Sequence, residues 1–442
     1  MDTVANNLDA SLGMTQPRRG IEAFTYVHRY LPAAAFYFFL NRAALPLGLF
    51  YTSIFAPLLY LWLIHMGQRW VTTKFLLGFA PFMVMNLWLG VDSKTQYLRS
   101  LVLMWTVYVA VYAFSLALIR GNAVGRLIEQ LIFLNFLQAI VALIIRPTPL
   151  WSLLWSDSGN VIEGGSRHLL RMCPQSATEP WAYGQLMLPL LIYAAYRVIY
   201  EGKLRNVLLL AMVLFPFVLC QSFGGISMGV AASALMLAAN LRRLIHRTSF
   251  WMTLIVLLVA CCLTILVPNP IMGRIFQISA GGDASTNLRV IFAYPAAWEI
   301  ASTKSIWWGV GLGQMKFLDL GILGHGIENT LPNAASQTLA ELGIVGLIAR
   351  FGVEFYLFYR TRVLRSPFRL AMFVICFVSQ LTGSYTDDVQ SYLMWLFAFF
   401  PFFDRISDDR LVPRRRVRIT PAQVLRLVAG WKPKLGAGEL ND

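Results

Sequence analysis

The chain has 442 residues, of which 57% are hydrophobic and 13% are charged, and its formal net charge is +15. Soluble domains carry about 25% charged residues, so the composition excludes an ordinary soluble protein. The apolar residues form runs near the ~20 residues that a helix needs to cross a bilayer. Lipid-exposed backbone must satisfy its own hydrogen bonds, and the runs do not alternate as barrel strands do. The sequence therefore predicts an all-α, polytopic transmembrane helical bundle.

About twelve membrane spans are predicted. In chain order they cover residues 26–41, 45–65, 72–91, 98–119, 126–145, 181–200, 206–222, 223–241, 250–267, 335–359, 367–385 and 389–403. Together they form a single transmembrane domain over residues 26–404. A short segment, 1–25, precedes this domain, and a basic tail, 405–442, follows it.

Lys and Arg gather in alternate connections between these spans. When the tail, with "PRRRVR" at 413–418, is placed in the cytoplasm, every short connection on that side is basic. On the other side, acidic residues balance the basic ones. The positive-inside rule then predicts an even number of spans with both termini in the cytoplasm. The excess of positive charge is explained by this orientation, and no nucleic-acid partner is expected.

Two outer segments, 146–180 and 268–334, are much longer than the other connections, and long loops in compact folds are usually functional. Both are expected to contain short helices. The first carries Trp151 and Trp155, which suit a membrane interface. In the second, Ser285 is expected to cap a short helix that leads to a pair of tryptophans, Trp307 and Trp308.

Arginines and a few acids occupy the predicted outer face, which favours a phosphorylated, sugar-bearing ligand. Guanidinium groups bind phosphate oxygens with two hydrogen bonds and keep their charge. The five His are scattered, so no metal site is expected. "GVGLG" at 309–313 lacks the spacing of a dinucleotide-binding fingerprint and is interpreted as a flexible or tightly turning re-entry into the membrane, so no cofactor is expected.

Few charged residues lie within the predicted spans. Glu341 sits two turns into a helix, where a carboxylate is costly and is by default a functional-site hypothesis. The alternative is a structural partner for an arginine or a cap for a loop. Arg350 and Glu354 are four residues apart and are expected to pair as a structural unit. "QSFGGISMG" at 221–229 is interpreted as a tight reversal between two spans.

Five motifs occur in a fixed order over roughly residues 165–350. They are "RMCPQSATEP", "SFGGI", "STNLRVIFAYPAAWEI", "SIWWGVGLG" and "PNAASQTLAELGIVGL". In this order the chain resembles the O-antigen ligase and polymerase superfamily of bacterial membrane glycosyltransferases. It departs from the ligases at Pro332, where they carry His, and at Phe223, where the family pattern has Arg. These departures favour a Wzy-type polysaccharide polymerase over a ligase, and a transporter of lipid-linked sugar is the third alternative.

The resemblance implies a location in the bacterial inner membrane and a reaction on its periplasmic side. An acceptor hydroxyl attacks a glycan carried on undecaprenyl diphosphate, and no metal or cofactor takes part. A chain-length regulator or a flippase is an expected partner, alongside the lipid bilayer. The implied catalytic residues are Glu179, His325 and Arg289, and the implied substrate-binding residues are Arg167, Arg171, Arg274, Asn333 and Glu341.

Overall fold

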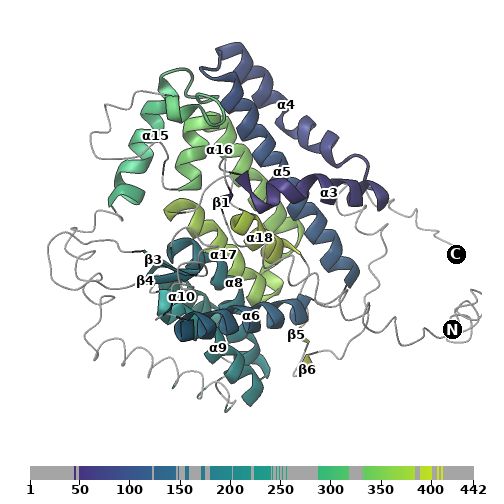
Figure 1. Cartoon of the computed structure of the whole chain (residues 1–442), viewed down its shortest axis with the longest axis vertical. Coiled ribbons are helices and arrows are strands. Elements are labelled where there is room, and N and C mark those ends of the chain that lie inside the picture. The colour runs from purple at the N-terminus through teal and green to yellow at the C-terminus, as the bar shows by residue number, and fades with distance from the viewer. Residues whose placement is uncertain are drawn as a thin grey trace, which may run out of the picture.

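The chain folds into a bundle of helices accompanied, in its described part, by three short antiparallel ladders (Figure 1). The computed structural model describes residues 44–45, 49–121, 124–145, 148, 155–158, 171–174, 180–201, 203–220, 223–239, 241, 245, 248, 251, 255, 287–317, 331, 333–383, 389–400, 406–407 and 410–411. The ladders pair β1 (Ala44–Leu45) with β2 (Leu49–Phe50), β3 (Trp155–Ser158) with β4 (Arg171–Pro174), and β5 (Ile406–Ser407) with β6 (Arg410–Leu411).

Most of the helices fall where the sequence predicts membrane spans. The helices are α3 (Tyr51–His65), α4 (Val71–Leu89), α5 (Lys94–Gly121), α6 (Val124–Ile145), α8 (Pro180–Glu201), α9 (Leu204–Cys220), α10 (Phe223–Ala239), η2 (Asn287–Phe292), α15 (Ala293–Ser302), η3 (Gln314–Phe317), α16 (Ala334–Arg360), η5 (Val363–Arg365), α17 (Pro367–Thr382) and α18 (Val389–Phe399). Of these, η2, α15, η3 and η5 lie in the connections between the predicted spans. The predicted spans 26–41 and 250–267 lie wholly or almost wholly outside the described residues.

Four stretches of helix in the described part are long and apolar enough to cross a membrane. They are Val71–Leu89, Lys94–Leu116, Gly125–Ile145 and Ala334–Arg360. Other apolar helices, such as α17, are shorter than the ~20 residues that a bilayer requires. The helical fold is thus confirmed, whereas the count of twelve spans, the orientation and the domain bounds stay predictions.

Helix α8 lies at the centre of the bundle. Its described side chains are buried all round apart from Arg197 and Glu201, which is the pattern of a core helix. It packs against α9, α10, α17 and α6. The largest buried side chains of this core are Tyr183, Tyr193, Tyr196, Phe217 and Phe368. The apolar cluster around α8 holds these helices in one bundle and so fixes the frame on which the loops rest.

Two sequence predictions are wrong in detail. The span predicted from residue 45 begins as helix only at Tyr51, because residues on either side of Pro46 and Gly48 pair as strands. The glycines of "SFGGI" lie inside the first turn of α10, not in a reversal before it. The short helix predicted in 146–180 stays a prediction, because the described part of that segment is mainly the β3–β4 ladder and the rest lies outside the described residues.

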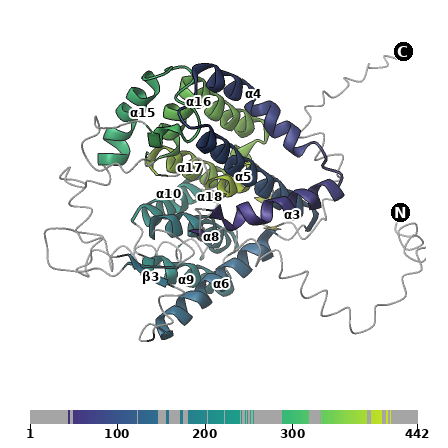
Figure 2. The ribbon, with the colours of Figure 1, turned by 45° about the horizontal axis from the view of Figure 1, so that its top comes forward.

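The second long segment does contain short helices, as predicted. The π-helical turn η2 leads directly into α15, and the single turn η3 follows. Figures 1 and 2 both place α15, α16 and the junction of α4 with α5 at the top of the view. The described part of the second segment therefore packs against α16 and lies near one end of the α4–α5 pair.

Candidate functional site

Helix α16 is broken at Gly343. The backbone angles there are φ 68° and ψ −168°, a region that essentially only glycine occupies. In an unbroken helix the next two N–H groups, of Ile344 and Val345, would donate to the carbonyl groups of Ala340 and Glu341. The break separates these partners, and buried backbone groups without partners are costly, above all in a membrane.

The segment 306–311 supplies a new partner for each separated group. Ile344 and Val345 donate to the carbonyl oxygens of Ile306 and Trp307, at N···O distances of 3.0 and 3.1 Å. The carbonyl oxygens of Ala340 and Glu341 accept from the N–H groups of Val310 and Gly311, at 3.0 and 2.9 Å. Loop and broken helix thus complete each other's hydrogen bonding, as two strands of a sheet would.

Two glycines allow this close approach. A side chain on Gly309 would collide with the backbone of Glu341, and one on Gly343 would collide with the backbone of Trp307. Gly309, Gly311 and Gly313 all have positive φ angles, of 72°, 103° and 69°. The prediction of a tightly turning segment at "GVGLG" is confirmed, and the packing explains why its residues are glycines.

Glu341 closes the same loop with its side chain. The residue is 5% exposed, and its Oε1 accepts a hydrogen bond from the backbone N–H of Gly313 at 3.0 Å. Bonds from a neutral N–H to a carboxylate are stronger than those between neutral groups. This contact corresponds to the loop cap, one of the two structural roles that the sequence leaves open for Glu341 beside a functional one.

Asn333 joins the start of α16 to the turn that carries Arg289. Its Oδ1 caps the helix by accepting from the backbone N–H of Ser336 at 2.7 Å. Its Nδ2 donates to the backbone oxygen of Arg289 at 2.8 Å. Arg289 lies in the π-helical turn η2, a geometry often found at functional sites. Two of the predicted site residues are therefore in direct contact, and Glu341 lies about 12 Å further along the axis of α16.

The C-terminal end of α17 is a meeting point for the second long segment and helix α8. The hydroxyl of Tyr294, on α15 just after Arg289, donates to the carbonyl oxygen of Leu381 at 3.1 Å. Burial raises the pKa of the Tyr294 phenol, so this hydroxyl keeps its proton. The side-chain amide of Gln185 donates to the carbonyl oxygen of Gly383 at 3.0 Å. Gln185 lies in the second turn of α8, the helix that directly follows Glu179 in the sequence.

The structure describes only part of the first long segment. Strand β4 begins at Arg171, which pairs with Ser158, and it lies against α8 and α9. Only the backbone of Arg171 is described. Figures 1 and 2 both show β3 and α15 on the same side of the molecule. The other predicted site residues lie outside the described residues, and they are Arg167, Glu179, Arg274 and His325.

Sequence reasoning missed the contacts that fasten the glycine loop to the bundle. The fully buried amide of Gln314 accepts from the backbone N–H of Ser93 at 2.9 Å and donates to its carbonyl oxygen at 3.1 Å. Lys304 pairs with Asp92 at 2.7 Å. Gln314 directly follows the glycine-rich motif, but its partner is 221 residues away in the sequence. No local pattern signals such a pairing.

The expected pairing of Arg350 with Glu354 is replaced by contacts to other residues. Arg350 Nε donates to Oε1 of Gln380 on α17 at 2.6 Å, and its Nη1 donates to the hydroxyl of Thr338 at 3.2 Å. Residues 338 and 350 would lie about 18 Å apart along a straight helix, beyond the reach of an arginine. The contact exists because α16 bends at Gly343.

Arg289 is a partly exposed cation whose backbone is bonded to Asn333, which is 0% exposed. Among the described residues, no group of three or more His, Cys, Asp or Glu lies close enough to hold a metal ion. Guanidinium groups in general bind phosphate groups and stabilise charge that develops on them.

Comparison with known proteins adds no relative to this picture. No protein-family model matches the chain, and no curated protein sequence matches it. The function is therefore argued from the site itself.

Proposed function

We propose that the protein is a membrane glycosyltransferase that polymerises oligosaccharide repeat units carried on undecaprenyl diphosphate. It would build an exopolysaccharide or O-antigen chain on the periplasmic side of the bacterial inner membrane. Both termini would lie in the cytoplasm. The observation that carries the proposal is the hydrogen bond from Asn333 to the backbone of Arg289, because it joins two of the five motifs on which the family resemblance rests.

The proposed reaction is a displacement at the anomeric carbon of the donor glycan. The oxygen of an acceptor hydroxyl forms the new glycosidic bond as the bond to the diphosphate oxygen breaks. The electron pair leaves with the lipid diphosphate, and the proton of the hydroxyl passes to Glu179 or His325. Arg289, together with Arg171, Arg167 and Arg274, holds the diphosphate and stabilises its growing charge. The base must lie within hydrogen-bond reach of the acceptor hydroxyl.

The break in α16 favours a structurally fixed element over the substrate-binding broken helix of a transporter. In transporters, the backbone groups freed by a helix break bind the substrate or the coupling ion. In α16, the four groups separated at Gly343 are bonded to the segment 306–311. The break therefore anchors a loop, and the polymerase is favoured over a transporter. A ligase would catalyse the same type of reaction with a different acceptor, and it is the alternative function.

Deletion of the gene distinguishes the three activities. A strain that lacks the polymerase accumulates single repeat units on the carrier lipid at the outer leaflet. A strain that lacks the ligase retains full-length polymer on the lipid. A strain that lacks the flippase has no lipid-linked sugar at the outer leaflet. We expect the first pattern, and either of the other two would contradict the proposed function.

Substitution of Arg289 tests the site directly. The purified Arg289→Ala protein, supplied with a defined lipid-linked repeat unit, is expected to form polymer at less than about a hundredth of the wild-type rate, as loss of one electrostatic contact to the transition state commonly costs. Arg126→Ala, which removes an exposed arginine in the first turn of α6, is the matched control and should leave the rate unchanged. Wild-type polymer yield from Arg289→Ala would remove this residue from the mechanism.

A further inference from the structure

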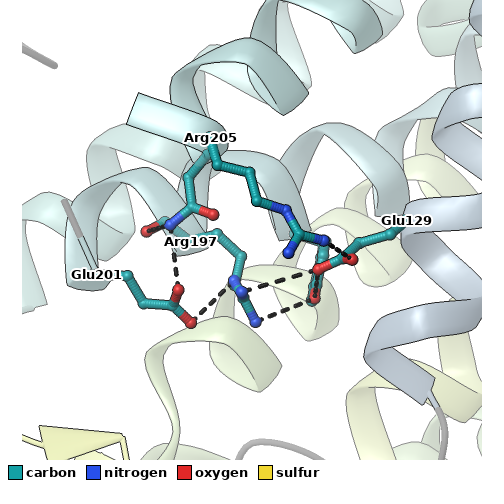
Figure 3. A network of polar contacts seen from close by, with 6 residues as sticks. Glu129, Arg197, Glu201 and Arg205 are labelled. Carbon is teal, nitrogen blue, oxygen red and sulfur yellow. Dashed lines mark hydrogen bonds and ion pairs between the residues drawn. The ribbon is translucent and has the colours of Figure 1, made fainter. Parts of the chain in front are cut away.

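Away from the candidate site, a cluster of charged residues joins the start of α6, the end of α8 and the start of α9 (Figure 3). Arg205 Nη2 lies 2.6 Å from Glu129 Oε2, so the first turn of α9 lies beside the second turn of α6. Arg197 on α8 lies 2.8 Å from Glu201 and 3.7 Å from Glu129. The cluster sits where α6, one of the membrane-length helices, begins. A membrane span over α6 would place the cluster at the depth of lipid headgroups.

The acids and the bases of this cluster face different ways. The Glu201 and Glu129 side chains are only 7% and 19% exposed, and both are bonded within the cluster. Figure 3 shows both carboxylates directed at the guanidinium of Arg197. In contrast, the Arg205 side chain is 70% exposed, and Arg126 and Lys203 are also exposed. The outward surface is consequently cationic, although the inward contacts are nearly balanced in charge.

Apolar side chains continue this cationic surface along both helices. On α6, Arg126, Phe133, Leu137 and Ile144 are exposed at spacings of seven, four and seven residues, which places them on one face. On α9, Leu204 and Leu208 are exposed one turn apart. A surface with cations at headgroup depth and an apolar stripe beneath them is complementary to a phospholipid with an anionic headgroup.

We infer that Arg126, Lys203 and Arg205 form a binding site for an anionic glycerophospholipid of the surrounding bilayer. Its headgroup phosphate lies among the three cations, and its acyl chain follows the exposed face of α6. The site lies on the side that the charge distribution predicts to be cytoplasmic. It is independent of the proposed polymerase activity, and its role is to hold the α6–α9 corner of the bundle at the membrane surface.

The test measures lipid binding to the full-length purified protein in detergent micelles. Native mass spectrometry is used to titrate phosphatidylglycerol and phosphatidylcholine against wild type and against Arg126→Gln/Lys203→Gln. Arg205 is left intact because it holds Glu129. Each surface cation contributes roughly fivefold to binding of an anionic headgroup, so the double variant should bind phosphatidylglycerol about 30-fold more weakly. Wild type should prefer phosphatidylglycerol to phosphatidylcholine.

Arg69→Gln/Lys74→Gln is the matched control, since both residues are exposed around the start of α4 and the same charge is removed. The control should bind phosphatidylglycerol as wild type does, and an equal loss in the control would overturn the proposed site. Unchanged binding of phosphatidylglycerol by the double variant would also overturn it. The same holds if wild type binds phosphatidylcholine equally well, or if undecaprenyl phosphate displaces phosphatidylglycerol at a lower concentration than phosphatidylglycerol itself requires. If the double variant fails to fold, the salt dependence of wild-type binding is the test. Added NaCl must weaken the binding of phosphatidylglycerol by wild type, and salt-independent binding overturns the inference.

Discussion

A single buried carboxylate shows how local chemistry fixes the site. Oε1 of Glu341 accepts a hydrogen bond from the N–H of Gly313. The glycine loop, residues 309–313, is thereby attached to α16 by a side chain as well as by backbone bonds. Removing the acceptor leaves a buried N–H without a partner, which costs more than the hydrogen bond contributes.

The prediction for Glu341 compares two substitutions. Glu341→Leu should lower the free energy of unfolding by about 1–3 kcal/mol, because the N–H of Gly313 loses its acceptor. Glu341→Gln keeps an oxygen in place and should lower it by less. Thermal unfolding of the purified variants in one detergent measures the difference. Equal stability of the two variants would show that the acceptor oxygen does not matter.

A second prediction at residue scale concerns Gly343. Gly343→Ala should prevent the loop from docking, because a side chain there meets the backbone of Trp307 and the φ angle is positive. We expect little folded protein and a lower unfolding midpoint. Gly352→Ala in the same helix has nothing within 4 Å and serves as the control, which should be at least as stable as wild type. Size-exclusion profiles and unfolding midpoints report both outcomes.

At the scale of elements, α16 consists of two half-helices held at an angle. The N-terminal half begins after its cap Asn333 and carries Glu341, and the C-terminal half carries Arg350, which reaches back to Thr338. The loop 306–311 holds the break from one side, and Arg350 bridges it while also bonding Gln380 on α17. The position of the N-terminal half, and hence of the Arg289 turn, depends on both.

The contact across the break is testable with a matched pair of variants. Thr338→Val keeps the shape of the side chain but removes the acceptor for Arg350 and the donor to Ala334. It should lower the free energy of unfolding by about 1–3 kcal/mol, because a partly buried charged donor loses a partner. Thr338→Ser retains the hydroxyl and should lose less. If Thr338→Ser is the less stable of the two, packing of the methyl group outweighs the hydrogen bond.

At the scale of the whole molecule, orientation is the main prediction left to test. Three predicted spans separate Lys203 from Ser302, so the two residues should face opposite sides of the membrane. In a protein without native cysteines, Ser302→Cys is expected to react with a membrane-impermeant maleimide in spheroplasts. Lys203→Cys should react only after the membrane is opened. Both residues are exposed, and labelling of both from one side would contradict the predicted topology.

The sequence by itself determined the class of the molecule and the position of its elements. Long apolar runs have few stable structures other than helices, because an unpaired backbone group in lipid is costly. The ranges of most predicted spans accordingly agree with helices such as α4, α6 and α16. Glycines at 309–313 indicated a flexible or tightly turning segment, since this signal depends on neighbouring residues only.

The tertiary structure decided which hydrogen-bond partners these residues have. The break at Gly343 is invisible in the hydropathy of α16, because its separated backbone groups are satisfied by a loop about thirty to forty residues away. The contacts of Gln314 with Ser93 and of Arg350 with Thr338 are likewise set by the folded chain and not by sequence neighbours. Hydrogen-bond partners are chosen by distance in space, and a bent chain brings together groups that no local pattern connects.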